Sequence, residues 1–221
     1  MGKKLKAVIF DLDGTLADAY KAVERSMNYA LTHAGFPKVS AYTIKRSVGW
    51  GDKHLIEGFV GKKHAPQVLA SYRRHHKGSL KAGVTFLPGA KQILKYLDDN
   101  GYLLAIASNR PTRFTRIILK VLKIENHFDY VLCGDKIDRP KPYPDILKLI
   151  LKKFKLRNQD ALYVGDMTID VKTGNRARVR TVAVLTGSST RAEIQALKPF
   201  KTIARMSQLK RIIEQIERNS N

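Results

Sequence analysis

Acidic residues are scarce in this sequence of 221 residues, which holds 19 Asp and Glu against 41 Lys and Arg. The formal net charge of +22 favours long-range attraction of anions such as phosphorylated metabolites, nucleic acids or acidic membranes. The basic residues are spread along the chain, and no arginine-rich arm, zinc finger or aromatic-rich RNA signature accompanies them. Because a generally basic surface explains the charge equally well, charge alone does not indicate a nucleic-acid-binding protein.

Long apolar runs and cysteines are lacking as well. No apolar run approaches the roughly 18 residues of a membrane span, and Asp11 and Asp13 come too early for a signal peptide. The single cysteine, Cys133, allows neither an internal disulfide nor a cysteine zinc cluster, and we expect it to be a small buried side chain. These absences argue against a membrane pump or a secreted precursor and predict a cytoplasmic protein of undetermined oligomeric state.

Short apolar runs of the kind found in buried parallel strands occur at five places in the chain. They are Ala7–Phe10, Leu103–Ala107, Tyr130–Cys133, Ala161–Val164 and Thr181–Leu185. Amphipathic helical patterns lie between the later runs, at Gly89–Asn100, Thr112–Leu122 and Pro144–Phe154, and Gly101 is placed to end the first of them. This alternation of strands and helices predicts an α/β fold with a doubly wound parallel sheet.

The segment 18–83 interrupts that alternation, because it contains no convincing strand run. Its helical patterns lie at 20–34, 41–47, 52–59 and 66–76. We therefore predict a helical subdomain at 18–83, inserted into a core formed by 1–17 and 84–221.

Polar side chains follow the predicted strands where each strand ends. Asp11 and Asp13 come directly after the first strand and precede Gly14; Ser108 and Asn109 follow the second. Lys141 precedes a helix, and Asp166 and Asp170 follow the strand at 161–164. Since ligands bind beyond the carboxyl ends of strands in open α/β sheets, we expect these groups to converge in one crevice.

These motifs, in this order, resemble those of the haloacid-dehalogenase (HAD) superfamily of phosphoryl-transfer enzymes. The matching stretches are Asp11-Leu12-Asp13-Gly14-Thr15, Ser108-Asn109, Lys141-Pro142-Tyr143-Pro144 and Gly165-Asp166-Met167-Thr168-Ile169-Asp170. The resemblance covers essentially the whole chain. The helical insert and the stretches 174–177 and 186–191 are similar to the phosphoglycolate-phosphatase-like branch, whose insert is a small cap.

The resemblance implies a role for each motif. Asp11 would be the nucleophile that forms an aspartyl-phosphate, and Asp13 would protonate the leaving group and later deprotonate water. Ser108 and Lys141 would bind the phosphoryl oxygens. Carboxylates crowded in one crevice need a hard cation between them, and Mg²⁺ fits. Its expected ligands are Asp11, Asp13 through the backbone carbonyl, and Asp166, with Asp170 either a ligand or a support for the ligands.

Other residues are weaker candidates. Asn109 is expected to bind substrate, and Arg110 is placed to reach a substrate anion. Around Gly49 and Gly51, where caps of this branch contact the substrate, Arg46, Trp50 and Lys53 either bind substrate or form an ordinary turn between helices.

Three further stretches favour structural roles. Thr15 is expected to support the first motif, and Asp18 either caps the first helix of the insert or touches the site. The cluster 72–77 is expected to be a solvated helix end, with polyanion contact as the alternative.

The resemblance favours a Mg²⁺-dependent phosphatase acting on a small phosphorylated metabolite such as phosphoglycolate. A phosphomutase similar to β-phosphoglucomutase remains an alternative, because it uses the same two aspartates and differs in how it excludes water. A basic protein that binds nucleic acid or processes its ends is a less favoured alternative, since all four aspartates are present. A dehalogenase would need neither Asp13 nor the metal carboxylates.

Overall fold

A sheet of six parallel strands forms the centre of the structure, a computed structural model that describes residues 5–218. The strand order is β5-β4-β1-β6-β7-β8. The strands are β1 (Ala7–Phe10), β4 (Leu103–Ser108), β5 (Tyr130–Cys133), β6 (Ala161–Gly165), β7 (Arg180–Val184) and β8 (Lys201–Ile203). Because the chain winds away from β1 in both directions, the strand order reverses there, and a crevice is expected at the carboxyl ends of β1, β4 and β6.

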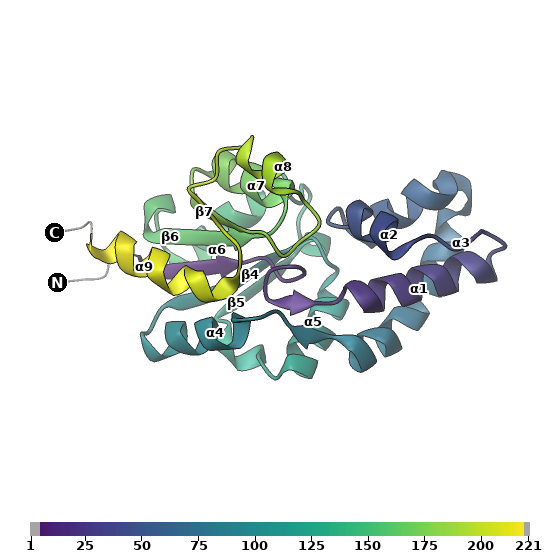
Figure 1. Ribbon diagram of the computed structural model, residues 1–221, viewed down its shortest axis with the longest axis horizontal. Helices are drawn as coiled ribbons and strands as arrows, with labels where there is room; N and C mark the ends of the chain where they lie inside the picture. The colour runs from purple at the N-terminus through teal and green to yellow at the C-terminus, as the bar shows by residue number, and fades with distance from the viewer. Residues whose placement is uncertain (1–4, 219–221) are drawn as a thin grey trace.

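Helices cover both faces of this sheet (Figure 1). One face packs against α4 (Ala90–Asp99), α5 (Thr112–Leu122) and α9 (Leu209–Arg218), and the other packs mainly against α6 (Asp145–Phe154). The helices α7 (Thr168–Ala177) and α8 (Arg191–Gln195) follow β6 and β7. Alternate residues of β1 enter the two cores: Val8 and Phe10 pack into one cluster, and Ala7 and Ile9 into the other. The expected doubly wound α/β fold is confirmed.

Three helices form a separate layer at the right of Figure 1, beyond the carboxyl ends of the strands. They are α1 (Tyr20–His33), α2 (Ala41–Ser47) and α3 (Asp52–Gly83), which bends at Gly61 where φ is 72°. Their apolar side chains form their own buried cluster, which includes Met27, Ile44 and Ile56. The chain enters this layer through β2 (Ala17–Asp18) and leaves it through β3 (Thr85–Phe86), and these two short strands pair antiparallel.

The structure departs from the sequence predictions in several elements. The five predicted strands are present, and Gly101 has the left-handed backbone expected beyond α4. The patterns at 52–59 and 66–76 fall in two helical parts of α3, which the non-helical backbone of Gly61 separates, as the sequence predicts. The strands β2, β3 and β8 and the helices α7, α8 and α9 were not predicted. The two- and three-residue strands are too short to show an alternating pattern.

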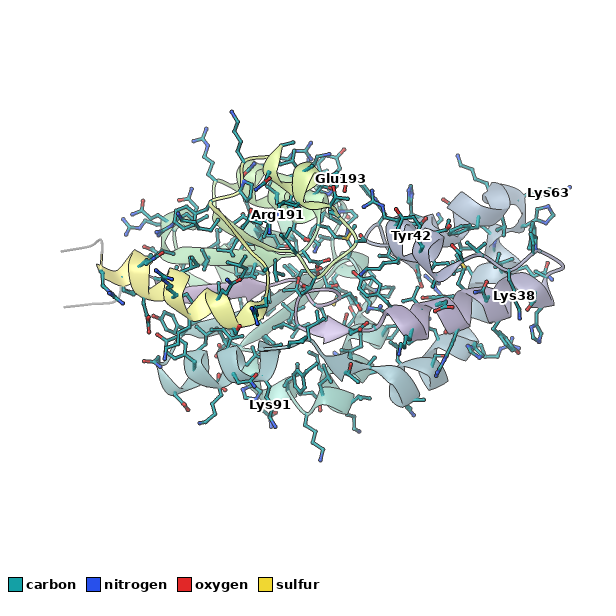
Figure 2. All side chains as sticks on the ribbon, viewed as in Figure 1. Lys38, Tyr42, Lys63, Lys91, Arg191 and Glu193 are labelled. Atoms are coloured by element: carbon teal, nitrogen blue, oxygen red, sulfur yellow. The ribbon has the colours of Figure 1, made fainter. Side chains whose placement is uncertain are left out.

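The positive charge is distributed over the molecule. Among the side chains labelled in Figure 2, Lys38 and Lys63 lie at the far end of the helical layer, Lys91 lies on α4, and Arg191 lies on α8. Within residues 5–218, no helix has both the length and the apolar character needed to cross a bilayer. Basic side chains therefore occur both on the helical layer and on the helices around the sheet.

Gly174 allows α7 to pack closely against β7, and this contact generates a prediction. A Cβ atom built on Gly174 would lie 1.7 Å from Thr181 Oγ1 and 3.0 Å from Thr181 Cβ. We expect Gly174→Ala to lower the free energy of unfolding by about 1–3 kcal/mol, because a packed interior resists added atoms. Urea denaturation measures this change.

Gly58 provides the matched control, since a Cβ there would meet no atom within 4 Å. Gly58→Ala should leave the stability unchanged or raise it by up to about 1 kcal/mol, because alanine favours a helix more than glycine does. Equal unfolding midpoints for the two variants would contradict the packing argument.

Candidate active site

The polar residues expected to converge do lie together, beyond the carboxyl ends of three adjacent strands. Asp11 follows β1 directly, Ser108 is the last residue of β4, and Asp166 follows the last residue of β6. Parallel pairing of β1 with both neighbours therefore brings segments about 100 and 150 residues apart in sequence to one edge of the sheet.

Asp11, Asp166 and Asp170 form a buried cluster of carboxylates at this edge. One oxygen from each lies within 4.8 Å of the others, and none of these residues is more than 7% exposed. Burial raises the pKa of Asp11 to about 7, against the opposing effect of Lys141 and with the help of the Asp170 charge. Burial and the charges of Asp170 and Asp11 also raise the pKa of Asp166 well above its usual value. Ionising all three carboxylates therefore requires positive charge among them.

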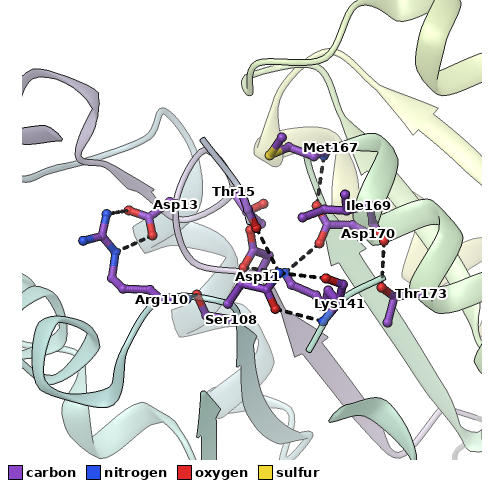
Figure 3. Close-up of polar contacts among 12 residues, drawn as sticks. Asp11, Asp13, Thr15, Ser108, Arg110, Lys141, Met167, Ile169, Asp170 and Thr173 are labelled. Atoms are coloured by element: carbon purple, nitrogen blue, oxygen red, sulfur yellow. Dashed lines mark hydrogen bonds and ion pairs between the residues drawn. The ribbon is translucent and has the colours of Figure 1, made fainter. Parts of the chain in front are cut away.

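Lys141 supplies one such charge. Its Nζ lies 2.8 Å from Asp11 Oδ1 and 2.7 Å from Asp170 Oδ1, and it donates a hydrogen bond to the hydroxyl of Tyr163 at 3.1 Å. Burial opposes the charged form of Lys141, but the two carboxylates outweigh burial and raise the pKa of the ammonium. Lys141 is therefore a fixed cation at the base of the crevice (Figure 3).

The surroundings of Asp166 fit a hard divalent cation. Asp166 Oδ1 accepts a hydrogen bond from Thr15 at 2.8 Å, whereas its buried Oδ2 has no hydrogen-bond partner. A Cβ on Gly187 would lie 1.8 Å from that oxygen and a Cβ on Gly14 2.4 Å from it, so only glycines leave room beside it. Carboxylate oxygens are the ligands that Mg²⁺ prefers, and the Asp11–Asp166 pair offers them in this space.

Both carboxylate oxygens of Asp170 accept hydrogen bonds from the protein. Its Oδ1 accepts hydrogen bonds from Lys141 and from Tyr163 at 2.7 Å each, and its Oδ2 accepts one from the backbone N–H of Met167 at 2.9 Å. These contacts favour the second of its two expected roles, which is to orient Lys141 and support the loop that carries Asp166.

Asp13 points away from this cluster. Figure 3 shows its carboxylate directed toward Arg110, on the opposite side of Asp11 from Lys141. The two oxygens of Asp13 accept hydrogen bonds from Arg110 Nε at 2.6 Å and Nη2 at 2.8 Å. Buried Ser108 accepts a hydrogen bond from the backbone N–H of Arg110 at 3.2 Å, and its own hydroxyl hydrogen remains available to a ligand.

A pocket of about 710 Å³, its open mouth included, lies between these residues and the helical layer. Apolar walls come from the insert and from the core, for example Val23, Leu55, Phe114 and Ile169. Apolar walls with a few polar groups among them are typical of small-molecule sites. Tyr20, which the helical pattern marks only as part of an apolar face, lines the pocket with a buried hydroxyl that has no hydrogen-bond partner.

Arg46, Trp50 and Lys53, the candidate substrate residues of the helical layer, do not line this pocket. Arg46 instead joins α2 to the core: it pairs with Glu193 of α8 at 2.6 Å and donates to the carbonyl of Ser188. Figure 2 shows Glu193 on the side of the core that faces the helical layer. Lys53 is largely exposed and lies 3.9 Å from Glu57, and the side chain of Trp50 is also exposed. For these three residues the geometry favours the alternative reading, an interhelical turn and its contacts.

The amide of Asn109 is engaged by the protein itself. It donates to the carbonyls of Gly49 and Lys141 at 2.9 Å each, and its oxygen accepts from the backbone N–H of Lys141 at 2.9 Å. Asn109 therefore connects the loop at Gly49 to the loop that carries Lys141.

Asp18 accepts a hydrogen bond from the backbone N–H of Tyr20, at the start of α1, at 3.1 Å. This contact favours the first of its two expected roles, which is to cap the first helix of the segment.

The sequence predicts a solvated helix end at 72–77, and the structure shows that this prediction is wrong. It lies inside α3, where Tyr72 and His76 are buried and Arg73 pairs with Asp52 at 2.7 Å. The sequence pattern gave the wrong prediction because most residues of this stretch are polar, although Tyr72 and His76 face the sheet domain and are buried. His76 is in contact with Arg110 and Phe114 there.

The chain is similar to curated proteins over most of its length. The chain is 28% identical over 214 residues to a phosphoglycolate phosphatase of Yersinia pestis, covering 94% of this chain and 92% of the relative. It is 26% identical over 210 residues to a phosphoglycolate phosphatase of Aquifex aeolicus, covering 95% and 97%.

The fold recurs among solved structures. A crystal structure described as a predicted phosphoglycolate phosphatase from Haemophilus somnus superposes with a TM-score of 0.89 at 23% identity, over 96% of this chain and 99% of that one. This likeness concerns the fold. In sequence, the family model described as haloacid dehalogenase-like hydrolase matches residues 8–184, a span that includes every aspartate of the cluster. The chain therefore belongs to the haloacid dehalogenase-like hydrolases.

Proposed function

We propose that this hydrolase is a Mg²⁺-dependent phosphatase that acts on a small phosphorylated metabolite, such as phosphoglycolate, through an aspartyl-phosphate intermediate. The observation that carries the proposal is the position of Asp11, which follows the central strand and lies 2.8 Å from buried Lys141 within a cluster of carboxylates. The names of the curated relatives support the same substrate class.

In the proposed reaction an oxygen of Asp11 attacks phosphorus. Only the ionised carboxylate is nucleophilic, so the raised pKa of Asp11 must be offset when substrate binds. Lys141 contributes to that offset, and its ammonium also stabilises the charge on the phosphoryl oxygens. Ser108 donates its free hydroxyl hydrogen to another of these oxygens.

Asp13 acts as the general acid in the first half of the reaction and as the general base in the second. In the first half its carboxyl group protonates the oxygen of the leaving alcohol, and in the second half it takes a proton from the attacking water. Its side chain lines the pocket on the side away from Lys141. The leaving group is expected to lie on this side.

The residues that would hold Mg²⁺ are Asp11 and Asp166 through their carboxylates and Asp13 through its backbone carbonyl. Asp170 would orient Lys141 and support the loop of Asp166. When bound, the cation would balance the clustered negative charge and draw electron density from the phosphoryl group.

We further propose that the segment 18–83 is a cap over a core formed by 1–17 and 84–221. The helices of this segment bury their own apolar cluster, and the pocket lies between them and the core. Arg46 joins cap and core through an exposed ion pair with Glu193, a kind of contact that is weak enough to open.

Release of inorganic phosphate from a panel of phosphomonoesters, with and without Mg²⁺, tests the proposed function. A phosphatase yields one phosphate per molecule of substrate consumed. A phosphomutase would instead isomerise a sugar phosphate with only trace hydrolysis and would require a bisphosphate activator.

The variant Asp11→Asn tests the nucleophile. The amide keeps the size of the side chain but cannot attack phosphorus, so turnover should fall by about 10³-fold or more. The exposed carboxylate of Asp138 gives the matched control, Asp138→Asn, which should keep its activity. Retention of more than about a tenth of wild-type turnover by Asp11→Asn would contradict the mechanism.

The raised pKa of Asp11 predicts an unusual pH dependence of stability without Mg²⁺. Between pH 4 and pH 7 the folded protein holds a proton on Asp11 that the unfolded chain has already released, since the pKa is raised from 3.8 to about 7. Stability should therefore fall as pH rises through this window, by up to about 1.4 kcal/mol per pH unit. Urea denaturation in the presence of a chelator measures the slope.

Saturating Mg²⁺ should remove much of this slope, because the cation stabilises the ionised carboxylates of the folded state. Asp11→Asn should make the slope without Mg²⁺ shallower, with a remainder due to the raised pKa of Asp166, whereas Asp138→Asn should preserve the slope. Stability that rises steadily from pH 5 to pH 7 in the chelated wild-type protein would refute this account.

A further inference from the structure

Arg110 holds the carboxylate of Asp13 with both oxygens engaged. The two hydrogen bonds, 2.6 and 2.8 Å long, form a bidentate pair, and the side chain of Arg110 is only 10% exposed. In this position neither oxygen of Asp13 is free to face a leaving group. The proposed acid and base is therefore restrained in the protein without substrate.

A chain of hydrogen bonds from the cap fixes Arg110. Its Nη1 donates to His76 Nε2 at 2.8 Å, His76 Nδ1 lies 3.0 Å from Ser26 Oγ, and Ser26 donates to the carbonyl of Ala22 at 2.8 Å. Burial, together with the charge of Arg110, lowers the pKa of His76 to about 2, so its ring is neutral and Nε2 is an acceptor. The guanidinium is thus oriented even when Asp13 leaves it.

Arg110 is also the only cation besides Lys141 among the described residues that line the pocket. Lys141 is held between Asp11 and Asp170, where the phosphoryl group is expected to bind. Asp52, which lines the pocket together with Asp11 and Asp13, is already paired with Arg73 at 2.7 Å. Arg110 is therefore the pocket cation that a second negative group on the substrate can pair with, by taking the place of Asp13.

We infer that Arg110 selects substrates whose leaving group carries a carboxylate, and that this carboxylate displaces Asp13 from the guanidinium and so frees Asp13 for proton transfer. This inference rests on the proposed phosphatase function and assigns to one residue both recognition of the substrate and release of the acid. The exchange replaces one bidentate carboxylate with another, so the guanidinium remains paired throughout.

The released Asp13 then takes part in a balanced step. An oxygen of Asp11 forms a bond to phosphorus, the bond from phosphorus to the leaving oxygen breaks, and its electron pair stays on that oxygen. Once it is released from Arg110, the Asp13 carboxylate takes up a proton from water in the pocket. This proton then passes to the leaving oxygen, which departs as an alcohol, and the water that hydrolyses the aspartyl-phosphate returns a proton to Asp13. A phosphoester without the second anion leaves Asp13 paired with Arg110 and reacts slowly.

Two phosphoesters of nearly equal size test the inference: 2-phosphoglycolate, which carries the carboxylate, and 2-hydroxyethyl phosphate, which does not. Phosphate release is measured with Mg²⁺ at about 150 mM salt, which screens the general attraction of the basic surface. In the wild-type protein we expect kcat/KM for phosphoglycolate to be about 10² to 10³ times larger. The preference should appear in kcat as well as in KM, because a role in binding alone would change only KM.

The variant Arg110→Met should reduce the ratio of the two kcat/KM values by about 10²-fold and abolish the preference in kcat. Arg110→Lys should retain part of the preference, since lysine keeps the charge but loses the bidentate geometry. The matched control is Arg116→Met, which removes an exposed cation from α5, the helix that follows Arg110, and should leave the ratio unchanged.

Equal use of the two esters by the wild-type protein would overturn the inference, and this comparison needs no variant to fold. A loss of the same factor for both esters in Arg110→Met and Arg110→Lys would also overturn it, because that pattern indicates a structural role. If the wild-type protein releases phosphate from neither ester but hydrolyses others, the inference fails while the phosphatase function stands. If it hydrolyses no phosphomonoester at all, both fail together.

Discussion

Repulsion among the carboxylates of Asp11, Asp166 and Asp170 is the constraint on which the rest of the site depends. These groups are buried beside one another, and a low dielectric makes their repulsion larger than it would be in water. Lys141 offsets part of the charge and thereby fixes the position of its own loop. Two apolar clusters, one on each face of the sheet, hold the strands in place against the repulsion. The geometry of the three carboxylates suits a metal ion.

The parts of the fold that the sequence predicted are those with strong local patterns. The run Ala7–Phe10 is apolar throughout because β1 is buried on both faces by helices. The strand Lys201–Ile203 lies at the edge of the sheet and buries only its last residue, so no apolar run marks it. The bend of α3 depends on the backbone of Gly61, and a glycine in a helical pattern does not by itself reveal a positive φ.

For the site, the positions of Asp11, Ser108, Lys141 and Asp166 followed from the ends of strands and from the family motifs. The orientation of Asp13 did not, because it depends on Arg110, which in turn contacts His76, a residue of α3 that lies 34 positions away in sequence. Arg46 and Lys53 were assigned to substrate from their place in the insert. Side-chain directions favour the alternative of an interhelical turn, since Arg46 pairs with Glu193 and Lys53 is largely exposed.

The pairing of β2 with β3 has a consequence for how such proteins diversify. Ala17 lies opposite Phe86, so the two ends of the inserted segment are neighbours in space although 69 residues separate them in sequence. A segment whose ends already meet can be exchanged for a longer or shorter one without disturbing the strands on either side, because the entropic cost of closing a loop grows slowly with its length. Recombination at this pair of strands would therefore alter what the pocket admits while leaving the carboxylate cluster and Lys141 untouched.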